Sequence, residues 1–163
     1  MANTQSMCTS FMSELMYGYH QFGQPTLTSR GSLTTPTNDT FKGALYLASA
    51  TINASTTAYS STGEVTGTGY TAGGVTVTNA TPPTYTNASS TAGVAYWTPS
   101  ASLTYTTVTL TTAFDTVLIY NSTQGNRAVS VHTFGSQTIT AGTFTLTMPS
   151  NTTTTALLRL ATT

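Results

Sequence analysis

LTYTTVTLTTAFDTVLIYNSTQGNRAVSVHTF, residues 103–134, is the stretch that decides the fold. Residues 103–110 alternate with a period of two, with Leu103 and Tyr105 on one face and Val108 and Leu110 on the other, as in a β-strand. Residues 114–120 form a compact apolar run, which we expect to be a central strand buried on both faces. Residues 121–126 are turn formers, so the chain is predicted to return along residues 127–134 as a β-hairpin.

Strands are also predicted on both sides of this hairpin. The segments that indicate them are residues 41–47, 75–78, 94–97, 138–148 and 156–160. Roughly six to eight short strands separated by turn residues are typical of a β-sandwich. The fold class is therefore predicted as mainly β, a sandwich of the jelly-roll or Greek-key kind with one short N-terminal helix.

Threonine occupies 42 of the 163 positions, whereas Asp, Glu, Lys and Arg together supply eight. Threonine has a stiff χ1 and fits a pleated, half-exposed surface, so hydroxyl groups replace charges on the outer faces of the predicted sheets. Four basic residues and a formal net charge of zero argue against nucleic-acid binding, because a phosphate track needs cations. So little charge also favours association with neighbours in an oligomer or a lattice.

The N-terminal segment is rich in methionine and poor in β-branched residues. A helix is predicted over residues 9–22, weakened by Gly18 and ended by Gly23 and Pro25. A methionine-rich helix is either adaptable core filler or an element that plugs a groove on a partner. We therefore divide the chain into an N-terminal helix and attachment arm, residues 1–38, and a β-sandwich domain, residues 39–163. The residues of this arm that are expected to bind a partner are Met7, Phe11, Met12, Leu15 and Met16.

Two long polar segments, residues 49–74 and 81–93, interrupt the strands. Segments of this length in a compact domain are usually functional or ordered by a partner. They hold Tyr59, Tyr70 and Tyr85, and tyrosine is enriched in recognition surfaces. These three side chains are expected either to bind a partner or to pin the loops onto the sandwich. Trp97 is expected to anchor the core or a subunit interface.

No catalytic constellation is recognisable in the sequence. The histidines are His20 and His132, and the acids are Glu14, Asp39, Glu64 and Asp115. On a continuous helix Glu14 and His20 would not share a face, and Asp115 is expected to cap a turn. The chain lacks the clustered ligands of a metal site and the nucleophile elbow of a serine hydrolase. The protein is therefore expected not to be an enzyme and to use no cofactor or metal.

Three further features are attributed to composition. Residues 67–72, GTGYTA, match a dinucleotide fingerprint, but a strand follows where that fingerprint needs a helix, so a glycine-rich loop is predicted. Cys8 is the single cysteine, can form no intrachain disulfide and is expected to be buried. Asn-x-Ser/Thr matches arise by chance in so hydroxyl-rich a chain; they begin at Asn38, Asn53, Asn79, Asn87, Asn121 and Asn151.

Targeting signals are also absent from the pattern. Residues 1–13 have neither the basic nor the apolar region of a signal peptide. No run approaches the ~20 apolar residues of a transmembrane helix. Synthesis in a cytoplasm without membrane association is therefore expected.

Four segments resemble a family of small structural proteins of tailed bacteriophages. They are residues 1–11 (MANTQSMCTSF), 39–48 (DTFKGALYLA), 57–74 and 118–135. The segments occur in the expected order and span most of the chain. The resemblance implies a virion-associated, β-rich protein with no catalytic residues to carry over.

With this resemblance, the composition points to a capsid decoration (cement) protein that binds the major capsid protein and stabilises the shell. Symmetry positions on a shell favour a homotrimer. The alternative is a tail, collar or baseplate component, including a receptor-binding tip that carries Tyr59, Tyr70 and Tyr85. Both place the protein in the virion, with the capsid surface favoured over the tail.

Overall fold

The computed structural model describes residues 3–23, 38–78, 82–86 and 93–162. It confirms a mainly β fold with one short N-terminal helix. The elements are β1 (Ser6–Met7), α1 (Thr9–Met16), β2 (Phe41–Leu47), β3 (Val75–Thr76), β4 (Thr84–Thr86), β5 (Val94–Trp97), β6 (Leu103–Asn121), β7 (Arg127–Leu146) and β8 (Leu158–Ala161). β2 and β5 have the predicted bounds. β1 and β4 were not predicted, because two or three residues are too few to show a period.

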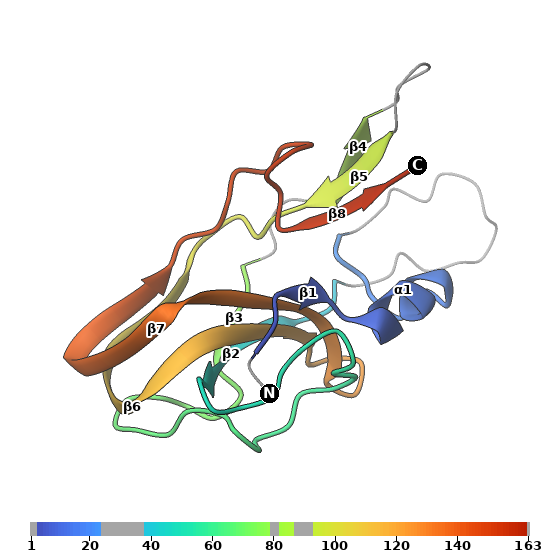
Figure 1. The fold of residues 1–163 in the computed structure, drawn as a ribbon. Coiled ribbons are helices and arrows are strands. Elements are labelled where there is room, and N and C mark those ends of the chain that lie inside the picture. The colour runs from blue at the N-terminus through green and yellow to red at the C-terminus, as the bar shows by residue number, and fades with distance from the viewer. Residues whose placement is uncertain (1–2, 24–37, 79–81, 87–92, 163) are drawn as a thin grey trace.

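The strands form two antiparallel sheets. The large sheet has the order β1-β7-β6-β2-β3, and the small sheet has the order β4-β5-β8. In Figure 1 the small sheet and α1 lie on one side of the large sheet, and residues 48–74 run along the opposite side. One hydrophobic core joins the two sheets, since Trp97 of β5 packs edge-on against Phe22 at a centroid distance of 4.8 Å, and Phe22 stacks on Phe41 of β2.

The predicted hairpin is present, but its strands are longer than expected. The predicted strands at 103–110 and 114–120 merge into β6, and those at 127–134 and 138–148 merge into β7, which ends at Leu146. The pairing shifts register between Tyr105 and Val108, where Thr106 and Thr107 of β6 lie opposite the single residue Thr143 of β7. This bulge brings Val108 and Leu110 to the buried side that Leu103 and Tyr105 occupy, whereas a regular strand would place them on the opposite face. The predicted split of these four residues between two faces is therefore wrong.

Thr107 lies in this bulge with φ +53°, a left-handed conformation that is unfavourable for a β-branched residue. Because Thr107 is exposed, replacing it loses little packing. We expect Thr107→Gly to raise the free energy of unfolding by about 0.5–1 kcal/mol in a urea titration. The exposed neighbour Thr106 has no positive φ, so Thr106→Gly is the control and should destabilise by about 1 kcal/mol. Equal losses in both variants would contradict this account.

The bent hairpin approaches β2 closely at Gly43. The Tyr105 hydroxyl donates a hydrogen bond of 2.8 Å to the Gly43 carbonyl oxygen. A Cβ at position 43 would lie 2.5 Å from Leu103 Cδ1, and a Cβ on Gly74 would lie 1.7 Å from the Gly43 carbonyl oxygen. Gly74 also has φ +71°, which favours glycine. Small residues at these positions therefore let the hairpin and β3 pack against β2.

The N-terminal segment is part of the main core. β1 pairs with β7, with Ser6 opposite Val131, and Phe11 and Phe22 are buried in the shared hydrophobic cluster. The core therefore extends across the boundary that the sequence suggested at residue 38. Most of the remaining attachment arm, residues 24–37, lies outside the described residues.

The helix is shorter than predicted, ending at Met16 instead of Phe22. Gly18 takes φ +74°, the conformation of a glycine that stops a helix. The Gly18 amide donates to the Leu15 carbonyl and the Tyr19 amide donates to the Glu14 carbonyl, which closes the last turn. Gly18 therefore ends the helix rather than weakening its middle, and residues 19–22 turn back toward the sheet.

Candidate interaction surface

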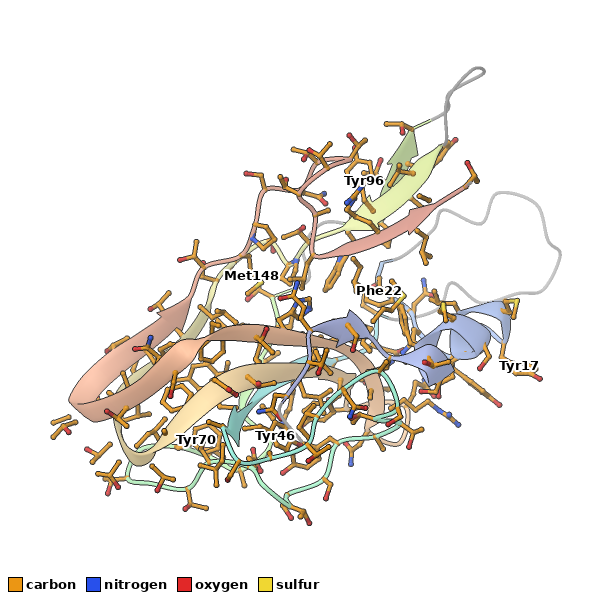
Figure 2. The ribbon with its side chains drawn as sticks, viewed as in Figure 1. Tyr17, Phe22, Tyr46, Tyr70, Tyr96 and Met148 are labelled. Atoms are coloured by element: carbon orange, nitrogen blue, oxygen red, sulfur yellow. The ribbon has the colours of Figure 1, made fainter. Side chains whose placement is uncertain are left out.

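Helix α1 presents one face to the core and leaves another exposed. Phe11 and Glu14 are buried, whereas Met12 is 49% and Met16 is 85% exposed. Tyr17, at the end of the helix, is also exposed and points away from the body of the molecule in Figure 2. The outer face of the helix therefore carries large apolar side chains that make little contact within the chain.

The small sheet has one apolar face, built by its pairing register. Tyr85 lies opposite Ala95, and Ala95 lies opposite Leu160, so these side chains form one row across three strands. The next row, Trp97 and Leu158, is buried in the core. Tyr85 is 68% exposed and Leu160 is also exposed. The face is therefore anchored at its base and open at its outer end.

A hollow of about 100 Å³ lies between this face and α1. Its wall includes Phe11 and Leu15 of α1, and Ala95 and Leu160 of the small sheet. Ala95 and Leu160 also line a second hollow that reaches Tyr85. The two hollows share Ala95 and Leu160. We call these hollows, together with the exposed Met12 and Met16 on the neighbouring face of α1, the α1–sheet surface.

A buried ion-pair cluster holds α1 in place. Glu14 binds the His20 Nε2 through one carboxylate oxygen at 2.7 Å and the Arg127 guanidinium through the other at 2.8 Å. Arg127 also lies over the Tyr19 ring, 4.4 Å from its centroid. From the sequence, Glu14 and His20 were predicted not to share a helix face. They nevertheless meet in the structure, because the helix ends before Gly18 and the chain turns back, which brings His20 next to Glu14.

The hydrogen bonds around His20 define its protonation state. The Asn121 side-chain oxygen accepts the amides of Thr123 and Gln124, so its Nδ2 faces His20 Nδ1 at 3.1 Å and Asp39 Oδ2 at 2.7 Å. His20 Nδ1 must then be an acceptor, and Nε2 donates to Glu14. Burial lowers the pKa of His20, and the Glu14 carboxylate opposes that shift. His20 is therefore neutral and structural in role.

Cys8, His20 and Asn121 are residue types that cooperate in cysteine proteases, but their arrangement here does not activate a nucleophile. The Cys8 side chain is fully buried, and burial, reinforced by Glu14, raises the pKa of its thiol to about 12. The basic nitrogen of His20 is Nδ1, which accepts from Asn121, while Nε2 donates its proton to Glu14. A buried protonated thiol without a free base is chemically inert.

A second polar cluster surrounds Glu64 in the long loop. Its carboxylate, in a residue only 6% exposed, accepts hydrogen bonds from the Tyr59 hydroxyl at 2.6 Å and the Tyr70 hydroxyl at 2.7 Å. The Gly73 amide donates a third, also at 2.7 Å. Burial raises the pKa of Tyr59 and of Tyr70, and the hydrogen bonds to Glu64 reinforce both shifts. Figure 2 shows Tyr70 and Tyr46 beneath the large sheet, where this loop crosses it.

The predicted partner-binding residues fall into two groups. Met12, Met16 and Tyr85 are exposed on the α1–sheet surface, whereas Phe11 is core and Met7 and Leu15 are half-buried against it. Tyr59 and Tyr70 donate hydrogen bonds from their hydroxyls to Glu64, as expected if these tyrosines pin the loop onto the sandwich. Trp97 is a core residue. Asp115 lies within β6, where its carboxylate accepts hydrogen bonds from the side chains of Asn3 and Thr116 instead of capping a turn.

Sequence reasoning missed Ala95, Leu160 and Tyr17 on this surface. Ala95 and Leu160 are brought together only by the β5–β8 pairing, so no local pattern could have joined them. Tyr17 lies one residue beyond the helix, where its exposure follows from the stop at Gly18.

Comparison with known proteins yields no relative. No family model matches the chain, and no curated protein or solved structure matches it significantly. Within the described residues, no helix is long and apolar enough to span a membrane. The same part of the chain contains no group of three or more His, Cys, Asp and Glu side chains that could hold a metal ion.

Proposed function

We propose that this protein is a structural virion protein of a tailed bacteriophage, and specifically a capsid decoration protein that binds the major capsid protein. The observation that carries the proposal is the α1–sheet surface, which combines apolar hollows that reach Leu160 and Tyr85 with the exposed Met12 and Met16 on the outer face of α1. Grouped exposed apolar side chains with aromatic and methionine members are typical of protein–protein contacts. The four segments that resemble phage structural proteins support the same assignment.

The chemistry of the surface suits short-range apolar contacts that stabilise a complex rather than long-range electrostatic attraction that would guide the encounter. With four acidic and four basic residues in the whole chain, long-range electrostatic attraction contributes little to encounter. Affinity then comes from burial of apolar area and shape complementarity. Contacts that exist only in the assembled shell stabilise that shell by mass action. On a symmetric shell a homotrimer would present three such surfaces at once.

Copy number tests the assignment to the shell. Quantitative mass spectrometry of purified particles should find this chain at about tens to hundreds of copies, matched to the capsid symmetry. A few copies per particle would refute decoration and favour a tail, collar or baseplate position. For that second candidate, the exposed Tyr85 is the remaining recognition residue of the three tyrosines.

Polar substitution of the exposed helix face should weaken attachment to the shell. The double variant Met12→Gln/Met16→Gln keeps good helix formers of similar size but removes apolar area that a partner would bury. We expect its affinity for isolated shells to fall by about 30-fold or more, measured by co-sedimentation, because each buried methionine contributes about 1–3 kcal/mol.

The matched control is Ser13→Gln, an exposed position on the same helix that is not apolar. It should leave both folding and attachment unchanged. Unaltered attachment of the double methionine variant would remove α1 from the interface.

A further inference from the structure

The long loop between β2 and β3 encloses an open hollow. β2 ends at Leu47 and the next strand begins at Val75, so residues 49–63 belong to no strand. These residues, together with Tyr46 of β2, line a hollow of about 620 Å³. Figure 1 shows residues 48–74 on the side of the large sheet opposite the small sheet. The hollow shares no lining residue with the α1–sheet surface, so it is a separate site.

Hydrogen bonds from three other parts of the chain hold this loop open. The Ile52 carbonyl accepts a hydrogen bond from the N-terminal segment, and the Thr57 carbonyl accepts one from β7. The Ser60 carbonyl accepts a third from the Tyr46 hydroxyl, at 2.6 Å. Because the rim is already fixed in the free chain, a ligand that enters the hollow does not have to order the loop first.

The walls of the hollow are uncharged and combine hydroxyl groups with apolar side chains. None of the residues that line it is acidic, basic or a histidine. Ser49, Thr57 and Thr62 line it, and their hydroxyl groups have no hydrogen-bond partner among the described residues. The apolar side chains of the lining are those of Ala50, Ile52 and Ala58. These walls suit a neutral ligand that offers both hydroxyl groups and C–H surface.

We propose that this hollow binds a neutral saccharide. A pyranose ring has hydroxyl groups around its rim and C–H groups on its faces, which matches the mixed lining. A charged ligand would lose its hydration without meeting an opposite charge. An extended peptide would need a strand edge to pair with, and residues 49–63 provide none. The volume also lies within the roughly 300–1,000 Å³ of ordinary ligand pockets.

Defined trisaccharides test the proposal on the full chain. The neutral probes are maltotriose, cellotriose, mannotriose and triacetylchitotriose, and the charged probes are trigalacturonate and chitotriose with its amines protonated. We expect at least one neutral probe to bind with a Kd of about 1 mM or tighter and to shift the amide resonances of residues 49–63. Both charged probes should bind at least about tenfold more weakly, and the neutral peptide Ac-TSTS-NH2 should not bind.

Two pairs of variants locate the binding in the hollow. Thr57→Val/Thr62→Val removes two hydroxyl groups with little change of shape and should weaken the neutral trisaccharide by about fivefold or more. Its control is Thr66→Val, an exposed change in the same loop but outside the hollow, which should leave the affinity unchanged. Ala58→Trp fills the hollow and should abolish binding, whereas Ser61→Trp, exposed and outside the lining, should retain it.

The proposal is overturned if no neutral trisaccharide binds, if the shifted amides lie elsewhere, or if Ala58→Trp binds as well as Ser61→Trp. Binding of Ac-TSTS-NH2 as tightly as the best trisaccharide would also overturn it. These measurements use the free chain, so none of them bears on attachment through α1.

Discussion

Replacing Glu64 by alanine is expected to lower the free energy of unfolding by about 3–5 kcal/mol. The substitution leaves the hydroxyls of Tyr59 and Tyr70 and the amide of Gly73 without their acceptor in a buried site. Tyr70 would also lose its fixed position as acceptor for the Leu45 amide in β2. The loss therefore reaches from the loop into the large sheet. A urea titration followed by tryptophan fluorescence would measure it, since Trp97 lies in the shared core.

The single-hydroxyl variants show how the effect is divided. Tyr70→Phe removes two hydrogen bonds and should cost about 2 kcal/mol, whereas Tyr59→Phe removes one at a more accessible site and should cost about 1 kcal/mol or less. Ser61→Ala, an exposed change in the same loop, is the control and should be neutral. A Glu64→Ala variant as stable as this control would show that the loop is not held by the carboxylate.

Acidification is expected to destabilise the protein between pH 7.5 and pH 5. Burial lowers the pKa of His132 to about 4 and also lowers the pKa of His20, both from a reference of 6.5. Below that reference the unfolded chain takes up protons that the folded chain refuses, so stability is fully present above pH 6.5 and falls as the pH decreases. His132 alone should account for about 1–2 kcal/mol of loss by pH 5. His20 acts in the same direction, because a proton on Nδ1 would face the Asn121 amide nitrogen.

Chemical denaturation at several pH values measures this slope. His132→Gln removes one of the two titrating groups, so its stability should depend less steeply on pH than that of the wild-type chain. The substitution need not preserve stability at pH 7.5, because the test is the slope and not the absolute value. A wild-type profile that is flat, or that rises toward pH 5, would contradict the assignment of two neutral histidines in the folded chain.

These expectations show which contacts the sequence revealed. The hairpin at residues 103–134 was predictable because an apolar run, a set of turn residues and a returning strand lie next to one another in the chain. β2 and β5 were predictable for the same reason, since each is a short apolar segment bounded by glycine, proline or hydroxyl residues. The alternation of apolar residues changes phase between Tyr105 and Val108, which is where the bulge lies. From the sequence alone, this stretch was interpreted as a regular strand.

The candidate surface was only partly predictable. The methionine-rich pattern indicated Met12 and Met16, which are exposed, but gave no reason to separate them from Phe11, which is buried. That separation depends on where the helix meets the sheet. Likewise, the loop tyrosines could have pointed outward or inward, and the buried carboxylate of Glu64 determined that Tyr59 and Tyr70 point inward.

The sequence by itself thus determined a mainly β chain with a central hairpin and one N-terminal helix, because periodicity and turn formers act over a few neighbouring residues. Tertiary structure decided that Glu14 meets His20 and Arg127, and that Ala95 meets Leu160. These contacts join residues far apart in the chain. Threonine suits exposed and half-buried strand positions equally well, so in this composition only long-range packing distinguishes the inner face of a strand from the outer one.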